Sequence, residues 1–267
     1  MIMLEKDIWV VQTLDVLFSI AIGQHLVFKG GTSLSKAYEV IHRFSEDIDI
    51  TVDIRRLLPE ETANSEIPPS RKQAKKWRSR INKFKLPELI ESEIIPQLET
   101  QLPPGAKLEF SGTDVLVDYS DIGIDQQSRS SALSLYVEPV VKLEFGGTST
   151  GAPSHEVGIT CDASYSEAAS EIELPRANVR VMDVQRTFWE KATLAHVACI
   201  KGKNNWRRYA RHWYDLVRIY ESVYWDECLR DVETARLVAR VKRTLLSSKR
   251  SRLRKSCGRK YSDSSGW

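Results

Sequence analysis

The sequence predicts an α/β fold of the α+β kind, in which helices flank a mixed β-sheet and a helical C-terminal region follows. Three observations support this class. Apolar and acidic residues alternate over residues 47–53, which is the period-two pattern of a half-buried strand. Residues 107–145 contain further runs of strand type, separated by turns at glycines. After Val181 the apolar residues recur at helical spacing instead.

The composition is that of a globular protein. The chain has 267 residues, of which 42% are hydrophobic and 28% charged, so it can bury a large core without disulfides or structural metals. Its longest apolar stretch, residues 16–22, is well short of the roughly 18 residues that indicate a membrane span. Charged residues at positions 5–7 interrupt any leader-like run. We therefore expect a soluble cytoplasmic protein whose four scattered cysteines form neither a zinc site nor disulfides.

The first 53 residues predict two helices and two strands. A helix is expected over residues 5–22, where apolar side chains recur at helical spacing. An apolar run at residues 26–28 ends at a Gly-Gly pair, and a second helix should begin directly after it, capped by the hydroxyl of Thr32 or Ser33. The alternating strand at residues 47–53 comes next.

The middle of the chain predicts a loop, a helix and three strands. Residues 54–70 hold three prolines and predict a loop, and helical character returns around residues 86–101. An exposed loop is expected from Gly146 to about residue 154, because that stretch is rich in Ser, Thr, Gly and Pro. The expected strands are residues 107–110, 114–119 and 132–145.

These elements divide the chain into three expected parts. Residues 1–175 would form the sheet-containing core domain, and residues 176–246 the helical C-terminal domain. Residues 247–267 are rich in Ser, Arg and Lys, with few apolar residues, and predict a disordered basic tail.

Charge is distributed unevenly along the chain. The formal net charge is +3, but residues 201–260 hold 18 Lys and Arg against 6 Asp and Glu. A second cluster, residues 71–85, has eight basic residues and no acid, with Trp77 and Phe84 among them. Basic patches with interleaved aromatics can follow a phosphate backbone and stack bases. The alternative interpretation of each cluster is a solvated helix face.

The motif with the clearest chemistry joins a glycine turn to paired carboxylates. Gly30 and Gly31, between a strand and a helix start, let backbone N–H groups approach a phosphate. Asp47 and Asp49 project to the same face of their strand. Neighbouring carboxylates repel each other unless a cation lies between them, and oxygen ligands suit Mg²⁺. The two motifs together favour a magnesium–phosphate site over exposed solvated acids.

Two later residues are further candidates. Lys191 lies on the apolar stripe of its own helix, so its ammonium should face an anion or a cleft, unless it snorkels to solvent. Asp215 shares a helical face with arginines at 208, 211 and 218. Either it belongs to a surface ion-pair network, or it positions an active-site Arg or Lys.

The spacing Gly30-Gly31-Thr32-Ser33, then Arg43-x-Ser45-x-Asp47-x-Asp49, resembles the polymerase-β-type nucleotidyltransferases. It is most similar to the AbiEii/AbiGii toxin branch, whose members pair with an antitoxin in bacterial toxin–antitoxin and abortive-infection systems. Residues 188–195 and 211–216 are similar to two later elements of that family. His212 stands where the family usually has an aspartate.

The resemblance implies a nucleotidyltransferase-fold core and Mg²⁺- or Mn²⁺-dependent transfer of a nucleoside monophosphate from an NTP. Asp47 and Asp49 would be the metal ligands. The third carboxylate would be Glu144, with Asp118 as the second choice, although Glu144 and Lys142 also fit an edge-strand charge pair. The implied catalytic residues are Asp47, Asp49, Lys191, Asp215 and Glu144. The implied nucleotide-binding residues are Gly30, Gly31, Thr32, Ser33, Lys36, Arg43 and Ser45.

The resemblance also suggests partners. The acceptor would be RNA, with the 3′ end of tRNA as the first choice, bound through residues 71–85 and the C-terminal segments. A cognate antitoxin protein would neutralise the toxin, whose activity would arrest growth by blocking translation. The alternatives are a catalytically decayed module that binds nucleic acid or an antitoxin, and a nucleotidyltransferase acting on a protein or a small molecule.

Overall fold

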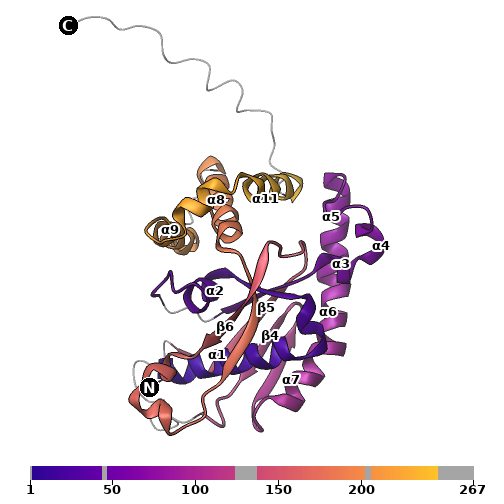
Figure 1. The fold of residues 1–267 in the computed structure, drawn as a ribbon. Helices are drawn as coiled ribbons and strands as arrows, with labels where there is room; N and C mark the ends of the chain where they lie inside the picture. The colour runs from indigo at the N-terminus through magenta and orange to yellow at the C-terminus, as the bar shows by residue number, and fades with distance from the viewer. Residues whose placement is uncertain (1, 44–46, 124–136, 202–205, 246–267) are drawn as a thin grey trace, which may run out of the picture.

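The sheet has seven strands, and its order β3-β4-β5-β2-β1-β7-β6 mixes parallel and antiparallel neighbours. The computed structural model describes residues 2–43, 47–123, 137–201 and 206–245 (Figure 1). At the centre, β2 is parallel to β5 and antiparallel to β1, which is parallel to β7. The strands are β1 (Leu26–Lys29), β2 (Asp47–Val52), β3 (Lys107–Ser111), β4 (Asp114–Asp118), β5 (Val140–Gly146), β6 (Ser154–Thr160) and β7 (Arg176–Met182).

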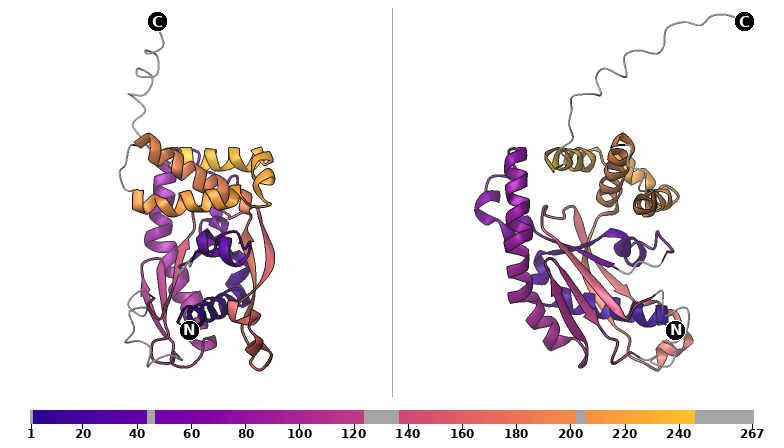
Figure 2. Two further views of the ribbon diagram at one scale, coloured as in Figure 1. Left: turned by 90° about the vertical axis from the view of Figure 1, so that its left-hand side faces the viewer. Right: turned by 180° about the vertical axis from the view of Figure 1, so that it is seen from behind.

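Helices cover one face of the sheet, and the C-terminal helices pack over one end of the opposite face (Figure 2). In Figure 2, the continuous run from α5 to α7 forms a column along the sheet, and α8, α9 and α11 lie above it. The longer α-helices are α1 (Ile2–Ser19), α5 (Arg71–Arg80), α8 (Val184–Lys201), α9 (Trp206–Tyr220) and α11 (Val232–Leu245). The shorter helices are α2 (Gly30–Lys36), α3 (Ile54–Leu57), α4 (Pro59–Thr62), α6 (Leu86–Leu89), α7 (Ile95–Gln101) and α10 (Trp225–Arg230). Single turns η1 (Ala21–His25), η2 (Ile81–Lys85), η3 (Ile90–Ile94), η5 (Asp162–Tyr165) and η6 (Glu167–Ser170) complete the chain.

The alternation in β2 sorts its side chains between the two faces. Ile48, Ile50 and Val52 are buried in the main core with α1 and the α5–α7 column. Asp47 and Asp49 point to the other face, beneath the C-terminal helices. The predicted fold class, a mixed sheet with flanking helices and a helical C-terminal region, is confirmed.

Several expectations about individual elements need correction. The helix after the glycines has no hydroxyl cap and ends at Lys36, sooner than its apolar stripe suggested. Residues 54–70 include the short helices α3 and α4 instead of loop alone. Strand β6 was not predicted. Strand β7 was also missed and was assigned to the helical part, yet it pairs with β1, so residues 176–182 belong with the sheet.

The expected exposed loop after Gly146 is wrong for much of its length. Gly147, Thr150 and Gly151 are buried, because this segment is folded back against the sheet and the helices. Strand β5 starts at Val140, so the predicted strand was too long, and its first residues, with the predicted tail, lie outside the described residues. In the part of the chain that the structure describes, no helix is long and apolar enough to cross a membrane.

Candidate active site

The strand register brings acidic side chains from three neighbouring strands together. Asp49 on β2 is directly opposite Glu144 on β5, and Glu144 is directly opposite Asp114 on β4. On the other side, Asp49 faces Lys29 at the end of β1. Residues opposite one another in a sheet share a face, so one carboxylate row runs across β2, β5 and β4.

Gly30 makes room for the Asp49 carboxylate. Its φ of +85° lies in the left-handed region, and a Cβ at this position would come within 2.0 Å of Asp49 Oδ2. Any side chain would therefore have to displace the carboxylate as well as adopt a strained backbone. The glycine that begins α2 is thus fitted to the acid on the neighbouring strand.

The environment of Asp49 disfavours its negative charge. Burial raises the pKa of this carboxyl above its ordinary value, and the charges of Glu144 and Asp47 act in the same direction. The positive charges of Lys29, which is the register partner of Asp49, and of Lys191 oppose this shift. A further cation at Asp49 would relieve the cost of ionising it.

These oxygens are the right donors for a hard divalent cation, but they are not arranged as a finished metal cage. Asp47, Asp49 and Glu144 offer carboxylate oxygen alone, as Mg²⁺ and Mn²⁺ prefer. Within the described ranges, no three acidic, His or Cys side chains are grouped closely enough to hold an ion. Asp47 and Asp49 fit a metal by their chemistry, and Glu144 would have to leave its present partner.

That partner is Lys142, whose ammonium bridges two acids of the row. It forms ion pairs with Glu144 and, at 3.0 Å, with Asp114. The hydrogen bond to Glu144 raises the pKa of Lys142 above its ordinary value, so the ammonium stays charged. Lys142 is also the register partner of Asp47. The expected charge pair between Lys142 and Glu144 is therefore present, together with a place for Glu144 beside Asp49.

Asp215 joins two cations from distant parts of the chain. It is fully buried on α9 and accepts hydrogen bonds from Lys191 Nζ at 2.7 Å and from Arg43 Nε and Nη2 at 3.1 and 3.2 Å. Burial alone would raise the pKa of Asp215, but Arg43 and Lys191 outweigh it and hold the pKa below its ordinary value. The group keeps one surplus positive charge. Asp215 is buried, so the alternative interpretation as part of a surface ion-pair network is wrong.

The two hydroxyls after the glycines bind backbone instead of pointing outward. Thr32 Oγ1 donates to the carbonyl of Asp47 at 2.5 Å, and Ser33 Oγ donates to the carbonyl of Gly30 at 3.1 Å. Both residues are buried. Thr32 thus attaches the start of α2 to β2, and Ser33 bonds within the first turn of α2. The hydroxyl contact to phosphate that the sequence suggested is therefore not prepared in this arrangement.

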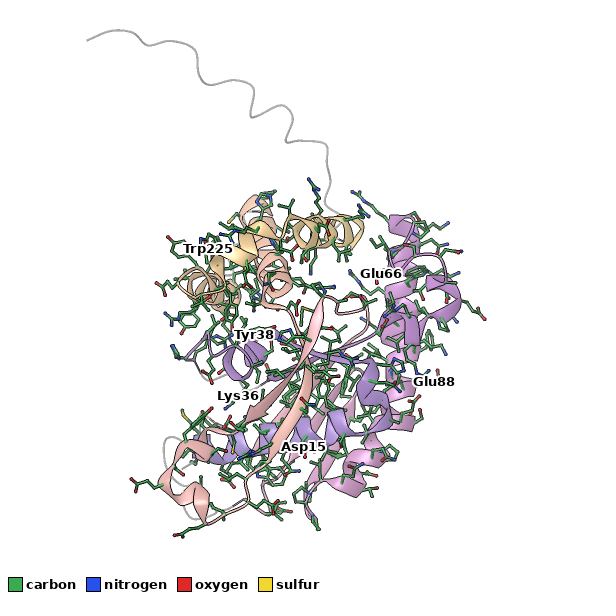
Figure 3. The ribbon with its side chains drawn as sticks, in the orientation of Figure 1. Asp15, Lys36, Tyr38, Glu66, Glu88 and Trp225 are labelled. Atoms are coloured by element: carbon green, nitrogen blue, oxygen red, sulfur yellow. The ribbon has the colours of Figure 1, made fainter. Side chains whose placement is uncertain are left out.

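Other candidate residues lie elsewhere. Lys36 forms ion pairs with Asp7 on α1 and with Asp162, on the side of α2 away from the C-terminal helices (Figure 3). Asp118 is opposite Val140, four residues along β4 from the position facing Glu144, and it accepts from the backbone of Ser120.

Ser45 and His212 are two further positions of the family motifs. Ser45 lies outside the described residues. His212, at the position of the family aspartate, is half-buried on α9 with its ring 6.2 Å from that of Tyr209.

Sequence reasoning missed Lys29 and Asp114. Lys29 directly precedes the glycines, and Asp114 starts a predicted strand, but the sequence held no signal that either would face the carboxylates. The register that places them depends on which strands pair, and that is a property of the tertiary fold.

Comparison with known families decides which group this chain joins. A sequence model of the family described as nucleotidyl transferase AbiEii toxin, type IV toxin–antitoxin system, matches residues 15–260, which is most of the chain. The chain belongs to the AbiEii nucleotidyltransferase toxin family. The resemblance inferred from the glycine and aspartate motifs is thereby confirmed for this AbiEii-family chain, and nucleotidyltransferase is the activity of its family.

A search of solved structures found MenT4, a nucleotidyltransferase toxin of Mycobacterium tuberculosis, with 18% sequence identity and a TM-score of 0.36. The match covers 70% of this chain and 51% of MenT4, so the chain spans about half the length of that protein. A search of curated proteins found no match.

Proposed function

We propose that this protein is a toxin that transfers a nucleoside monophosphate from an NTP to RNA, with the 3′ end of tRNA as its first-choice acceptor, and releases pyrophosphate. The observation that carries the proposal is the register of Asp49 with Glu144, beside a glycine that leaves no room for a side chain. Asp47 and Asp49 would hold Mg²⁺ or Mn²⁺, with Glu144 as the third carboxylate. When bound, the metal would polarise the phosphoryl group and activate the attacking hydroxyl.

The residues of this chain would then bind and orient the nucleotide. Lys191 and Arg43, held by Asp215, would face the triphosphate and offset charge that develops on the departing pyrophosphate. The backbone N–H groups at Gly30 and Gly31 would approach the phosphates. Ser45 keeps its proposed contact to the triphosphate. Lys36 is not part of the proposed site, because its ammonium forms ion pairs with Asp7 and Asp162.

The basic clusters support an RNA acceptor. Helices α5 and α11 are in contact, so basic residues that are far apart in the sequence come together on these two helices (Figure 1). Trp77 is buried in the core and cannot stack on a base, whereas Phe84 is exposed. Phosphate contacts by such a surface position a polynucleotide without reading its sequence. Among the side chains of α5 and α11 whose exposure the structure describes, the exposed cations are Arg71, Lys72, Lys75, Lys76, Arg78, Arg80, Arg236 and Arg240.

Substitution of Asp49 tests the transferase. We expect the full chain to label total RNA with at least one α-labelled NTP in the presence of Mg²⁺, and Asp49→Asn to lower this signal at least 100-fold. Asp15→Asn is the matched control, because Asp15 lies on α1 and also has a pKa raised by burial (Figure 3). Equal labelling by Asp49→Asn and the native chain, with every NTP and with RNA and protein as acceptors, would refute the function. If the native chain labelled protein and not RNA, the acceptor would be a protein instead of RNA.

Substitution of Lys142 tests whether Glu144 belongs to the metal site. Lys142→Gln removes the cation that neutralises Glu144 and Asp114, so we expect Mn²⁺ to bind several-fold more tightly, as measured by electron paramagnetic resonance. Lys107 is an exposed lysine on β3 that pairs with Asp121. As the control, Lys107→Gln should leave the Mn²⁺ affinity unchanged. If Mn²⁺ affinity were unchanged in both variants, Glu144 would not be a ligand of the metal.

The family membership also supports a partner. An antitoxin encoded for this toxin would be its neutralising partner, in keeping with the type IV toxin–antitoxin description of the family.

A further inference from the structure

A small cavity lies beside the carboxylate row, beneath the C-terminal helices. Its volume is about 110 Å³. Thr51 and Gly146 form its floor, and α8 and α11 form its roof. Four charged residues line it, and we call it the basic cavity after them: Lys29, Arg186, Glu190 and Lys242.

Cations outnumber acids in the basic cavity. The guanidinium of Arg186 is 4% exposed and bonds to Glu190 through Nε at 3.3 Å, which leaves its other N–H donors for the cavity. Across the described part of the chain, the ammonium groups of Lys29 and Lys242 form no ion pair or hydrogen bond. Three positive charges therefore face one carboxylate.

The arrangement is costly without a further anion. Burial lowers the pKa of Lys242, and the positive charges of Lys29 and Arg186 lower it further. Burial raises the pKa of Glu190, but the surrounding cations outweigh it, so this carboxyl is ionised. The lining therefore has two more cationic than acidic side chains, a composition that suits an anion such as a phosphate group.

The size of the cavity limits its occupant. The space of about 110 Å³ is large enough for a few small groups. Pockets for drug-sized ligands and cofactors span about 300–1,000 Å³, so a nucleoside does not fit. A tetrahedral phosphoryl group does, and the hydroxyls of Thr148 and Ser149 in the lining add hydrogen-bonding groups.

The cavity is next to the proposed site of transfer. Thr51 follows Asp49 by two residues on the same face of β2, which at about 3.4 Å per residue places the floor about 7 Å from Asp49. Lys29 reaches both places, since it is opposite Asp49 and lines the cavity.

We propose that the basic cavity is a binding site for a single phosphoryl group, held by Lys29, Arg186 and Lys242. The assignment of that group to a substrate rests on the proposed function, whereas the binding itself does not. The phosphoryl group is either the terminal one of the NTP or a backbone phosphate of the acceptor RNA.

Binding can be measured without transfer. We expect calorimetry with inorganic phosphate and pyrophosphate, in the absence of divalent metal, to detect binding that Lys242→Gln and Lys29→Gln each weaken about tenfold, equivalent to about 1.4 kcal/mol. Arg230→Gln, which removes an exposed cation from α10, should bind both anions like the native chain. Asp49→Asn should retain phosphate binding while losing transfer, so the two proposals fail separately.

Binding of nucleotides and of RNA by Lys242→Gln distinguishes the two possible origins of the phosphoryl group. If it is the terminal phosphate of the NTP, Lys242→Gln weakens binding of the triphosphate but not of the nucleoside monophosphate. If it belongs to the acceptor, Lys242→Gln weakens binding of a short RNA in the absence of NTP, whereas Arg230→Gln does not.

Thermal unfolding separates a binding role from a structural one. Without an anion, Lys242→Gln removes an unfavourable buried charge, so its Tm should equal or exceed that of the native chain, and phosphate should no longer raise the Tm. The proposal is overturned if both variants bind phosphate and pyrophosphate with native affinity. It is also overturned if Lys242→Gln is destabilised and still shows the native phosphate-induced rise in Tm.

Discussion

Gly30→Ala should abolish most transfer activity, although it adds a single methyl group. The new Cβ would lie 2.0 Å from Asp49 Oδ2, so the carboxylate must move. A displacement of about 1 Å at a catalytic group can cost about 100-fold in rate, and we expect a loss of at least that size. Labelled-NTP transfer measures it, and Mn²⁺ titration should show weaker metal binding in parallel.

The control for Gly30→Ala reproduces the backbone strain without the clash. Gly112 also has a positive φ, of 66°, and a Cβ there meets no described atom within 4 Å. Gly112→Ala should therefore cost about 1 kcal/mol of stability and leave transfer unchanged. If Gly30→Ala kept native transfer, or lost no more than Gly112→Ala, Asp49 would not need the space that the glycine leaves.

The glycine and aspartate motifs could be found from sequence because each depends on a short stretch of chain. A period-two alternation in β2 places Asp47 and Asp49 on one face whatever the rest of the fold does. The fit of Gly30 to Asp49 could not be found, since it requires β1 to pair antiparallel with β2 in one register.

Long-range pairing also explains the failures. Lys36 was assigned to the nucleotide by the family resemblance, but its charge is satisfied by Asp7, near the start of the chain. Strand β7 was missed although it pairs with β1 at the centre of the sheet. The two basic clusters were seen separately, and the contact between α5 and α11 brings together the parts of them that lie on these two helices.

Asp215 could be singled out from the sequence, but its partners could not. Its helical spacing from nearby arginines suggested either a surface network or a positioning acid, and no feature of α9 alone decides between them. The buried contacts with Arg43 and Lys191 come from a distant loop and a neighbouring helix. The sequence thus identified the residue, and the tertiary structure identified its partners.

Asp215→Asn should reduce both stability and transfer. The amide would leave Arg43 and Lys191 without a counter-charge in a buried site, and breaking such a pair costs about 3–5 kcal/mol. Because Asp215 would no longer hold the two cations in place for the proposed triphosphate, transfer should fall by about 100-fold or more in protein that remains folded. Urea unfolding and labelled-NTP transfer measure the two effects.

Acidic pH provides an independent check on this variant. The pKa of Asp215 lies below its ordinary value of 3.8, so its carboxylate contributes stability that is present above that pH and lost as the pH falls through the folded-state pKa. The difference in unfolding free energy between the native chain and Asp215→Asn should therefore be constant near neutrality and shrink below pH 4.

Asp7→Asn separates the positioning role of Asp215 from general stabilisation. Asp7 is also a buried acid that pairs with a lysine, Lys36, but it lies on α1, away from the carboxylate row. We expect Asp7→Asn to lose stability while the folded protein keeps native transfer. If both variants lost stability and both kept transfer, Asp215 would be a structural residue, because the cations it holds would not need to face the nucleotide.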